Sequence, residues 1–318
     1  MTSAFQTLSR RCMTVSALLV LAACSGGSGT DLPFYLDNPT DQPLTVRIDG
    51  KDHVLAAHSG ADVALEPGKH ALSAPAVGDI EFIVYKRWGD QSALEEFFDG
   101  NDYNKSRRGG LINPTLADYV IVREIYAVDD KAASHVKPGQ RKIELNGMRY
   151  QGAIEIVNGL FIGKDWKYGV HEDFAESETS STQQSNIFAK IFTAADFDRY
   201  YRQNYGTPEP AKTAPQDPEA RKARALAPPA PFPDFDSPDM QKVAQPLRDL
   251  VTRYQTAADP AAQADIQKEY TAQMQGIVTE YMKVANKLSE KDRQKYNDFI
   301  VWTGATIGKP ALVIGTAK

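Results

Sequence analysis

Hydrophobic and polar residues alternate through the first half of the chain. Leu44, Val46 and Ile48 alternate with Thr45 and Arg47, which is typical of a half-buried strand. Similar runs, separated by turn residues such as Asp-Gly, Pro-Gly and Asn-Gly, lie at 53–55, 63–65, 70–72, 80–85, 119–126, 141–150 and 153–162. The pattern predicts a mainly antiparallel β region over residues 31–206, with a small unit of hairpins at 31–75.

The hydrophobic period becomes helical near the C-terminus. Thr193, followed by Asp196, already predicts one short helix start, and Gly206 ends it. Residues 207–237 are crowded with proline and alanine, which predicts an extended, semi-rigid linker with at most one helical turn at 221–224. Three amphipathic segments follow within residues 238–318, which predicts a helical hairpin or three-helix bundle.

These patterns together predict an α+β protein with a β region before a helical domain. Pro246 lies inside the first helical segment and is expected to kink or restart that helix. Asp259-Pro260 and Ser289 with Asp292 predict the starts of the second and third helices. Lys309-Pro310 is expected to end the last one.

The first 23 residues have a different character. Arg10 and Arg11 precede a short apolar run that ends at Ala23, which is the pattern of a secretory signal peptide. The run is too short for a membrane-spanning helix, which needs about 20 apolar residues. Leu21-Ala22-Ala23-Cys24 resembles the lipobox of bacterial lipoproteins, and a Gly/Ser tether follows at 24–30.

This resemblance implies that Cys24 carries the lipid, palmitate included, and becomes the first residue of the mature chain. Ser25 rather than aspartate follows it, which implies the outer membrane with the body facing the periplasm. Several acyl chains give stable anchoring where one chain does not. The alternative is an ordinary cleaved signal with a chance cysteine, or a buried helix.

Composition narrows the range of functions. The formal net charge is −5, and removing residues 1–23 takes away two arginines and no acids, which leaves −7. An acidic chain is poorly suited to nucleic acids. Cys12 leaves with the signal peptide, so Cys24 would be the sole cysteine of the mature chain, and no disulfide or thiol catalysis is expected.

Candidate chemistry is sparse, and no cofactor is predicted. His53, His58 and His70 are close enough in sequence to suggest a metal site, although their spacing matches no specific metal motif. The acidic residues at 95–102 could serve acid–base chemistry, but a solvated loop is the commoner explanation. The nucleophile-elbow, zinc-protease and P-loop patterns are absent.

Aromatic residues gather in two segments, and exposed aromatics often mark binding surfaces. The candidate binding residues are Trp88, Phe97, Phe98, Tyr103, Trp166 and Tyr168. Core packing is the alternative for about half of them. The sequence therefore predicts a lipid-anchored envelope protein with a non-enzymatic binding or scaffold role and an envelope protein partner. The alternatives are a lipid-anchored hydrolase or a metal-binding protein.

Overall fold

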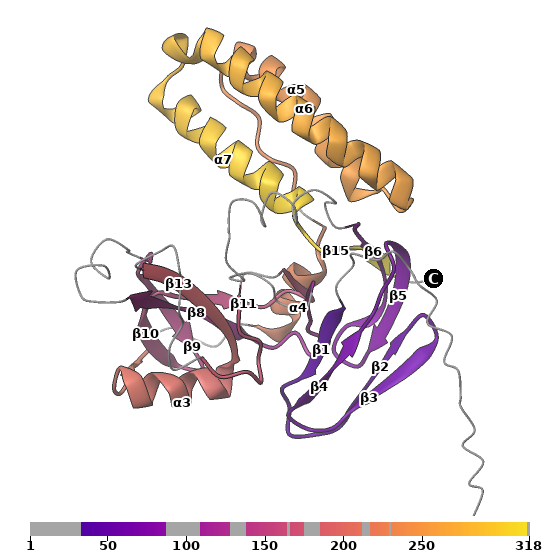
Figure 1. Cartoon of the computed structure of the whole chain (residues 1–318), viewed down its shortest axis with the longest axis vertical. Coiled ribbons are helices and arrows are strands. Elements are labelled where there is room, and N and C mark those ends of the chain that lie inside the picture. Colours follow the sequence, from indigo (N-terminus) through magenta and orange to yellow (C-terminus); the bar gives the residue numbers. More distant parts are fainter. Residues whose placement is uncertain are drawn as a thin grey trace, which may run out of the picture.

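The computed structural model describes residues 33–86, 109–127, 138–163, 166–174, 185–211, 217–228 and 230–316. Figure 1 shows two β units side by side and a helical unit that projects from them. The α+β class is therefore confirmed, with the β strands first and the long helices after them.

The first β unit is a sandwich of two sheets. One sheet has the order β12-β7-β1-β4 and the other β15-β6-β5-β2-β3. Its strands are β1 (Phe34–Asn38), β2 (Leu44–Ile48), β3 (Lys51–Leu55), β4 (Ser59–Val63), β5 (Gly68–Ala74), β6 (Gly78–Val84), β7 (Gly110–Ile112), β12 (Phe161–Gly163) and β15 (Ala311–Thr316). The pairings among these described strands are antiparallel except that between β1 and β7. Apolar side chains from both sheets form one core.

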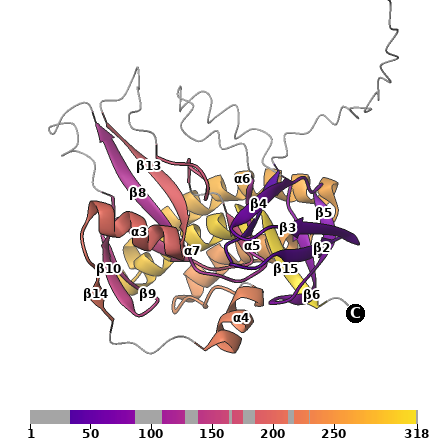
Figure 2. The ribbon, with the colours of Figure 1, turned by 90° about the horizontal axis from the view of Figure 1, so that it is seen from below.

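The second β unit is built on β8 (Tyr119–Ala127), which is buried on both faces at its start. It pairs with β11 (Ile154–Val157) and β13 (Ser185–Thr193), while a hairpin of β9 (Arg141–Leu145) and β10 (Met148–Gly152) also pairs with β14 (Glu209–Pro210). The helix α3 (Ala194–Asn204) begins at Thr193, whose side chain accepts a hydrogen bond from the Asp196 amide as predicted. Its Phe197 is buried among residues of β8, β9 and β10, and Figure 2 shows α3 beside that hairpin.

Local turn chemistry explains the hairpins. Asp49 and Gly50 have φ values of 50° and 79°, and Asn146 and Gly147 have φ values of 50° and 75°. Two successive positive φ values are typical of the type I′ turn, whose twist matches that of the flanking strands. Both predicted hairpin turns are confirmed.

The helical unit contains α5 (Pro238–Gln255), α6 (Pro260–Val284), the short 3-10 helix η1 (Ala285–Lys287) and α7 (Glu290–Ile307). Ser237, Asp259 and Ser289 cap the three long helices through their side chains. The first helix continues through Pro246 without restarting. None of the described helices combines the length and the apolar character that a membrane span requires.

Two segments differ from the sequence prediction. Residues 218–226 within the expected linker form the helix α4 (Pro218–Leu226), because Asp217 caps it and Pro218 suits a first helical position. Residues 311–316, expected within the helical domain, form β15 and pair with β6 in the sandwich. The chain thus returns from α7 into the sheet in which β6 lies.

The strands β6 and β15 join the sandwich to the helical unit. Phe82 and Val84 point into the sandwich core, whereas Ile83 and Tyr85 pack with the helices. The same alternation places Val313 in the sandwich core and Leu312 against the helices. Since alternate residues of a strand face opposite sides, one pair of strands serves both cores.

Candidate functional site

A fully buried carboxylate lies where the two β units meet. It belongs to Asp37, in a strand whose five residues are all buried. Tyr119 of β8 donates a hydrogen bond to Asp37 Oδ2 at 2.6 Å, and His171 Nε2 lies 3.2 Å from Asp37 Oδ1. Burial raises the pKa of Tyr119, so its hydroxyl remains a donor at neutral pH. The carboxylate therefore has a partner on each oxygen, as a buried charge requires.

His171 is the accessible member of this cluster. Its side chain is 42% exposed, and its ring lies edge-on to Tyr35 with the centroids 5.8 Å apart. The hydrogen bond to Asp37 raises the pKa of His171, although partial burial and Lys190 oppose the shift. The pair with Asp37 thus favours the protonated form of His171.

Lys190 fixes the loop that carries His171. Its ammonium group is buried and donates to the carbonyls of Gly169 at 3.0 Å and Val170 at 3.3 Å, and also to that of Glu172. Burial lowers the pKa of Lys190. Three backbone acceptors compensate for the desolvation of this cation, so its role is to shape residues 169–172.

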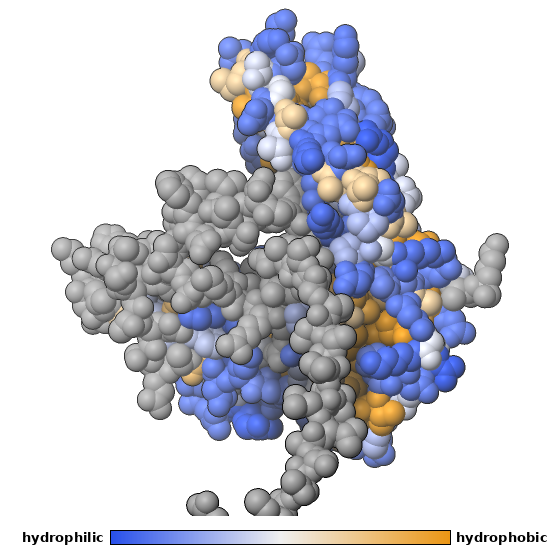
Figure 3. Space-filling model, turned by 45° about the vertical axis from the view of Figure 1, so that its right-hand side comes forward, coloured by the Kyte–Doolittle hydropathy of each residue, from blue (hydrophilic) through white to orange (hydrophobic). Residues whose placement is uncertain are grey.

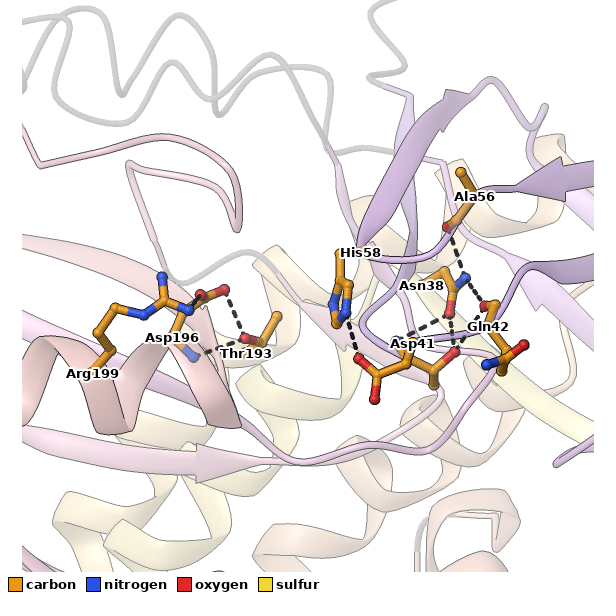
Figure 4. A network of polar contacts seen from close by, with 9 residues as sticks. Asn38, Asp41, Gln42, Ala56, His58, Thr193, Asp196 and Arg199 are labelled. Carbon is orange, nitrogen blue, oxygen red and sulfur yellow. Dashed lines mark hydrogen bonds and ion pairs between the residues drawn. The ribbon is translucent and has the colours of Figure 1, made fainter.

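Figure 4 shows two further sets of polar contacts, one on the sandwich and one on the second β unit. On the sandwich, buried Asn38 donates to the carbonyls of Gln42 and Ala56, both at 2.8 Å. On the second unit, Thr193 donates to Asp196 at 2.8 Å, and Arg199 pairs with Asp196 at 3.2 Å. Each of these contacts satisfies a turn or a helix start, which is a structural role.

Of the three histidines of the predicted metal site, His58 and His70 have separate partners. His58 Nε2 lies 2.6 Å from Asp41 Oδ1. His70 lies 2.6 Å from Asp49 Oδ2 through Nδ1 and 2.7 Å from the Glu66 carbonyl through Nε2.

Each ring nitrogen of His70 therefore already has an oxygen partner within the protein. His53 lies opposite Val46 in the β2–β3 pair. Within the described ranges, no three side chains of histidine, cysteine, aspartate or glutamate come together to hold a metal ion.

The predicted binding aromatics have different locations. Trp88, Phe97, Phe98, Tyr103 and the lipidation candidate Cys24 lie outside the described residues. Trp166 is not an exposed binding residue, because it is buried in the core between the two β units. Tyr168 is half-buried and packs edge-on against Phe174, with the centroids 5.5 Å apart.

Sequence reasoning missed the pairing of Asp37 with His171, because 134 positions separate them. One signal was present: Asp37 stands in the short run Phe-Tyr-Leu-Asp-Asn, where an acid among apolar residues indicates a buried charge. No serine, threonine or cysteine of the described segments hydrogen-bonds to His171. The geometry of the cluster is that of a polar contact that joins the two β units.

Comparison with known proteins finds no match: no family pattern, no curated protein and no solved structure resembles the chain closely enough to be matched. The functional argument therefore rests on the residues and their geometry.

Proposed function

We propose that this protein is a lipid-anchored envelope protein with a non-enzymatic binding or scaffold role. In this proposal Cys24 carries the lipid, the outer membrane holds the anchor, and the folded body faces the periplasm. The lipobox Leu21–Cys24 and the Gly/Ser tether support the anchor. The separate partners of His58 and His70 favour this role over a hydrolase or a metal-binding protein.

The observation that carries the binding role is the apolar surface of the projecting helical unit. Val278 and Met282 lie one turn apart on α6 and are 50% and 67% exposed, and Val301 on α7 is 71% exposed. Figure 3 shows apolar residues that interrupt the hydrophilic surface of this unit. Exposed apolar side chains on one projecting element favour contact with a partner protein.

The length of the tether would limit how far from the membrane the folded body meets such a partner. Eight residues lie between Cys24 and Pro33, where the described structure begins. A fully extended segment of that length spans about 30 Å. The sandwich would therefore stay close to the membrane, and the helical unit would present its surface to neighbouring envelope components.

The anchor is tested by metabolic labelling with palmitate and by membrane fractionation. The wild-type chain should incorporate label and sediment with the outer membrane. Cys24→Ala should incorporate none and remain in the periplasmic fraction. Equal labelling of the two proteins would disprove the anchor.

The binding role is tested with a photo-crosslinking amino acid at position 282 or 301 in intact envelopes. A matched control carries it at position 54, because Val54 is similarly exposed, at 73%, but lies on the sandwich. We expect a discrete adduct from positions 282 and 301 and none from position 54. Absence of adducts at both helical positions would contradict the scaffold role.

A further inference from the structure

A cavity of about 380 Å³ opens between the two sheets of the sandwich and α4. It lies along β15 and beside the residues that lead into β12, each the outer strand of its sheet in the described structure. Ala225 and Leu226 of α4 pack against the sandwich core next to it. The volume is within the range of small-molecule sites, about 300–1,000 Å³.

The charged residues around this cavity are all positive. Of the described residues that line it, Arg224 and Lys309 carry charge, and neither aspartate nor glutamate is among them. The nearby acid Asp118 is already occupied: Arg221 pairs with it at 2.5 Å and Asn158 donates to it at 3.1 Å. An anion entering the cavity would therefore meet no competing carboxylate in its lining.

Lys309 has no anionic partner of its own. No hydrogen bond or ion pair reaches its ammonium group from the described part of the chain. The residue as a whole is exposed, and desolvation of its ammonium group lowers the pKa of Lys309. An unpaired cation in such a position is stabilised by any anion that binds beside it.

The second cation, Arg224, belongs to helix α4. Helix α4 ends at the cavity, and the partial negative charge of its last carbonyls would repel an anion. Arg224 lies in that last turn, where it offsets this repulsion.

Among the other lining residues, Asn158 is polar and most of the rest carry apolar side chains. Leu160 and Phe161 contribute one side, and Leu312 and Val313 contribute the other. Leu160 and Val313 also belong to the sandwich core, and Phe161 packs against it. The lining thus combines two cationic side chains with apolar ones.

We propose that this cavity binds a small amphipathic anion, a carboxylate or phosphate group joined to an apolar chain. The anionic group lies against Lys309 and Arg224, and the apolar chain lies against Phe161 and Val313. The proposal does not depend on the envelope role above.

The test measures binding of decanoate to the full chain carrying Cys24→Ala, which keeps detergent out of the assay. Isothermal titration calorimetry should show one site for decanoate, with decanol and inorganic phosphate each binding at least about tenfold more weakly. Phosphate binding as tight as decanoate binding would show an anion site without an apolar part and would overturn the proposal, as would tight decanol binding.

Two variants locate the site. Lys309→Gln should weaken decanoate binding about tenfold or more, whereas Lys287→Gln, the same charge change at an exposed lysine on η1, should leave it unchanged. Ala227→Trp should block the cavity, with circular dichroism and thermal unfolding confirming that the variant is folded. Unchanged binding in both Lys309→Gln and folded Ala227→Trp would overturn the assignment.

Discussion

The side chain of Gln263 accepts a hydrogen bond from the backbone amide of Lys86 at 2.7 Å, although 177 positions separate the two residues. The same side chain donates to the carbonyls of Val84 at 3.1 Å and Ala257 at 2.9 Å. Gln263 is fully buried, and beside it the rings of Tyr85 and Tyr254 stack at 4.3 Å. One amide therefore links the end of β6 to the helical unit.

The first prediction concerns this link. Gln263→Met keeps the volume but leaves one amide and two carbonyls without this partner, which should lower the free energy of unfolding by about 2–4 kcal/mol. Urea denaturation measures the change. Gln275→Met, at an exposed position of the same helix, is the control and should stay within about 0.5 kcal/mol of wild type. Equal stability of the two variants would show that Gln263 does not stabilise the link between β6 and the helical unit.

The second prediction concerns the buried carboxylate at the joint. Tyr119→Phe removes the hydroxyl that donates to Asp37 and should cost about 1–3 kcal/mol, because a buried acceptor loses a partner. Tyr296→Phe is the matched control, since its ring stacks on Tyr281 at 3.8 Å and its hydroxyl has no hydrogen bond in the described structure. Chemical denaturation should show a lower free energy of unfolding for Tyr119→Phe and little change for Tyr296→Phe.

The third prediction concerns pH. The hydrogen bond to Asp37 raises the pKa of His171 above its usual value of 6.5. The resulting stabilisation is complete below pH 6.5 and is lost as the pH rises through the pKa of the folded state. His171→Gln should therefore lose more stability at pH 5.5 than at pH 8.5, with a difference under about 1 kcal/mol because the ring is partly exposed.

A second histidine provides a control of opposite sign. Burial lowers the pKa of His53, so its protonation opposes folding at low pH. His53→Gln should gain stability at pH 5.5 relative to pH 8.5, in urea titrations run in parallel. If both variants show the same trend, the assignment of His171 to the Asp37 pair is wrong.

The fourth prediction concerns the β9–β10 turn. Gly147 has a φ of 75°, and a Cβ there would meet no atom within 4 Å. The cost of Gly147→Ala is therefore conformational, about 1–2 kcal/mol. Gly139→Ala also has free space and lacks a positive φ, so thermal unfolding should show little change for it.

Sequence reasoning succeeded where the signal was local. Asp49-Gly50, Asn146-Gly147 and Thr193 define turns and a helix start through their own backbone preferences and side chains. The three long helices were predictable for the same reason, because their caps and apolar stripes lie within each segment. These features account for most of the fold.

Sequence reasoning failed for segments whose conformation depends on residues far away in the sequence. The residues of β15 are a short apolar run after a helix stop, and their strand conformation comes from pairing with β6. Helix α4 was obscured by the surrounding proline and alanine, although Asp217 and Pro218 are a recognisable start. The joint around Asp37 could not be assembled, because β1, β8 and the loop at 166–174 meet only in three dimensions.

The pairing of β15 with β6 also affects the timing of folding. Until residues 311–316 have been synthesised, β6 has an open edge and neither core that it serves is complete. At 5–20 residues per second, the ribosome needs about 10–45 s to travel from β6 to β15. During that interval the nascent chain cannot complete its sandwich, and the edge of β6 remains available to other strands.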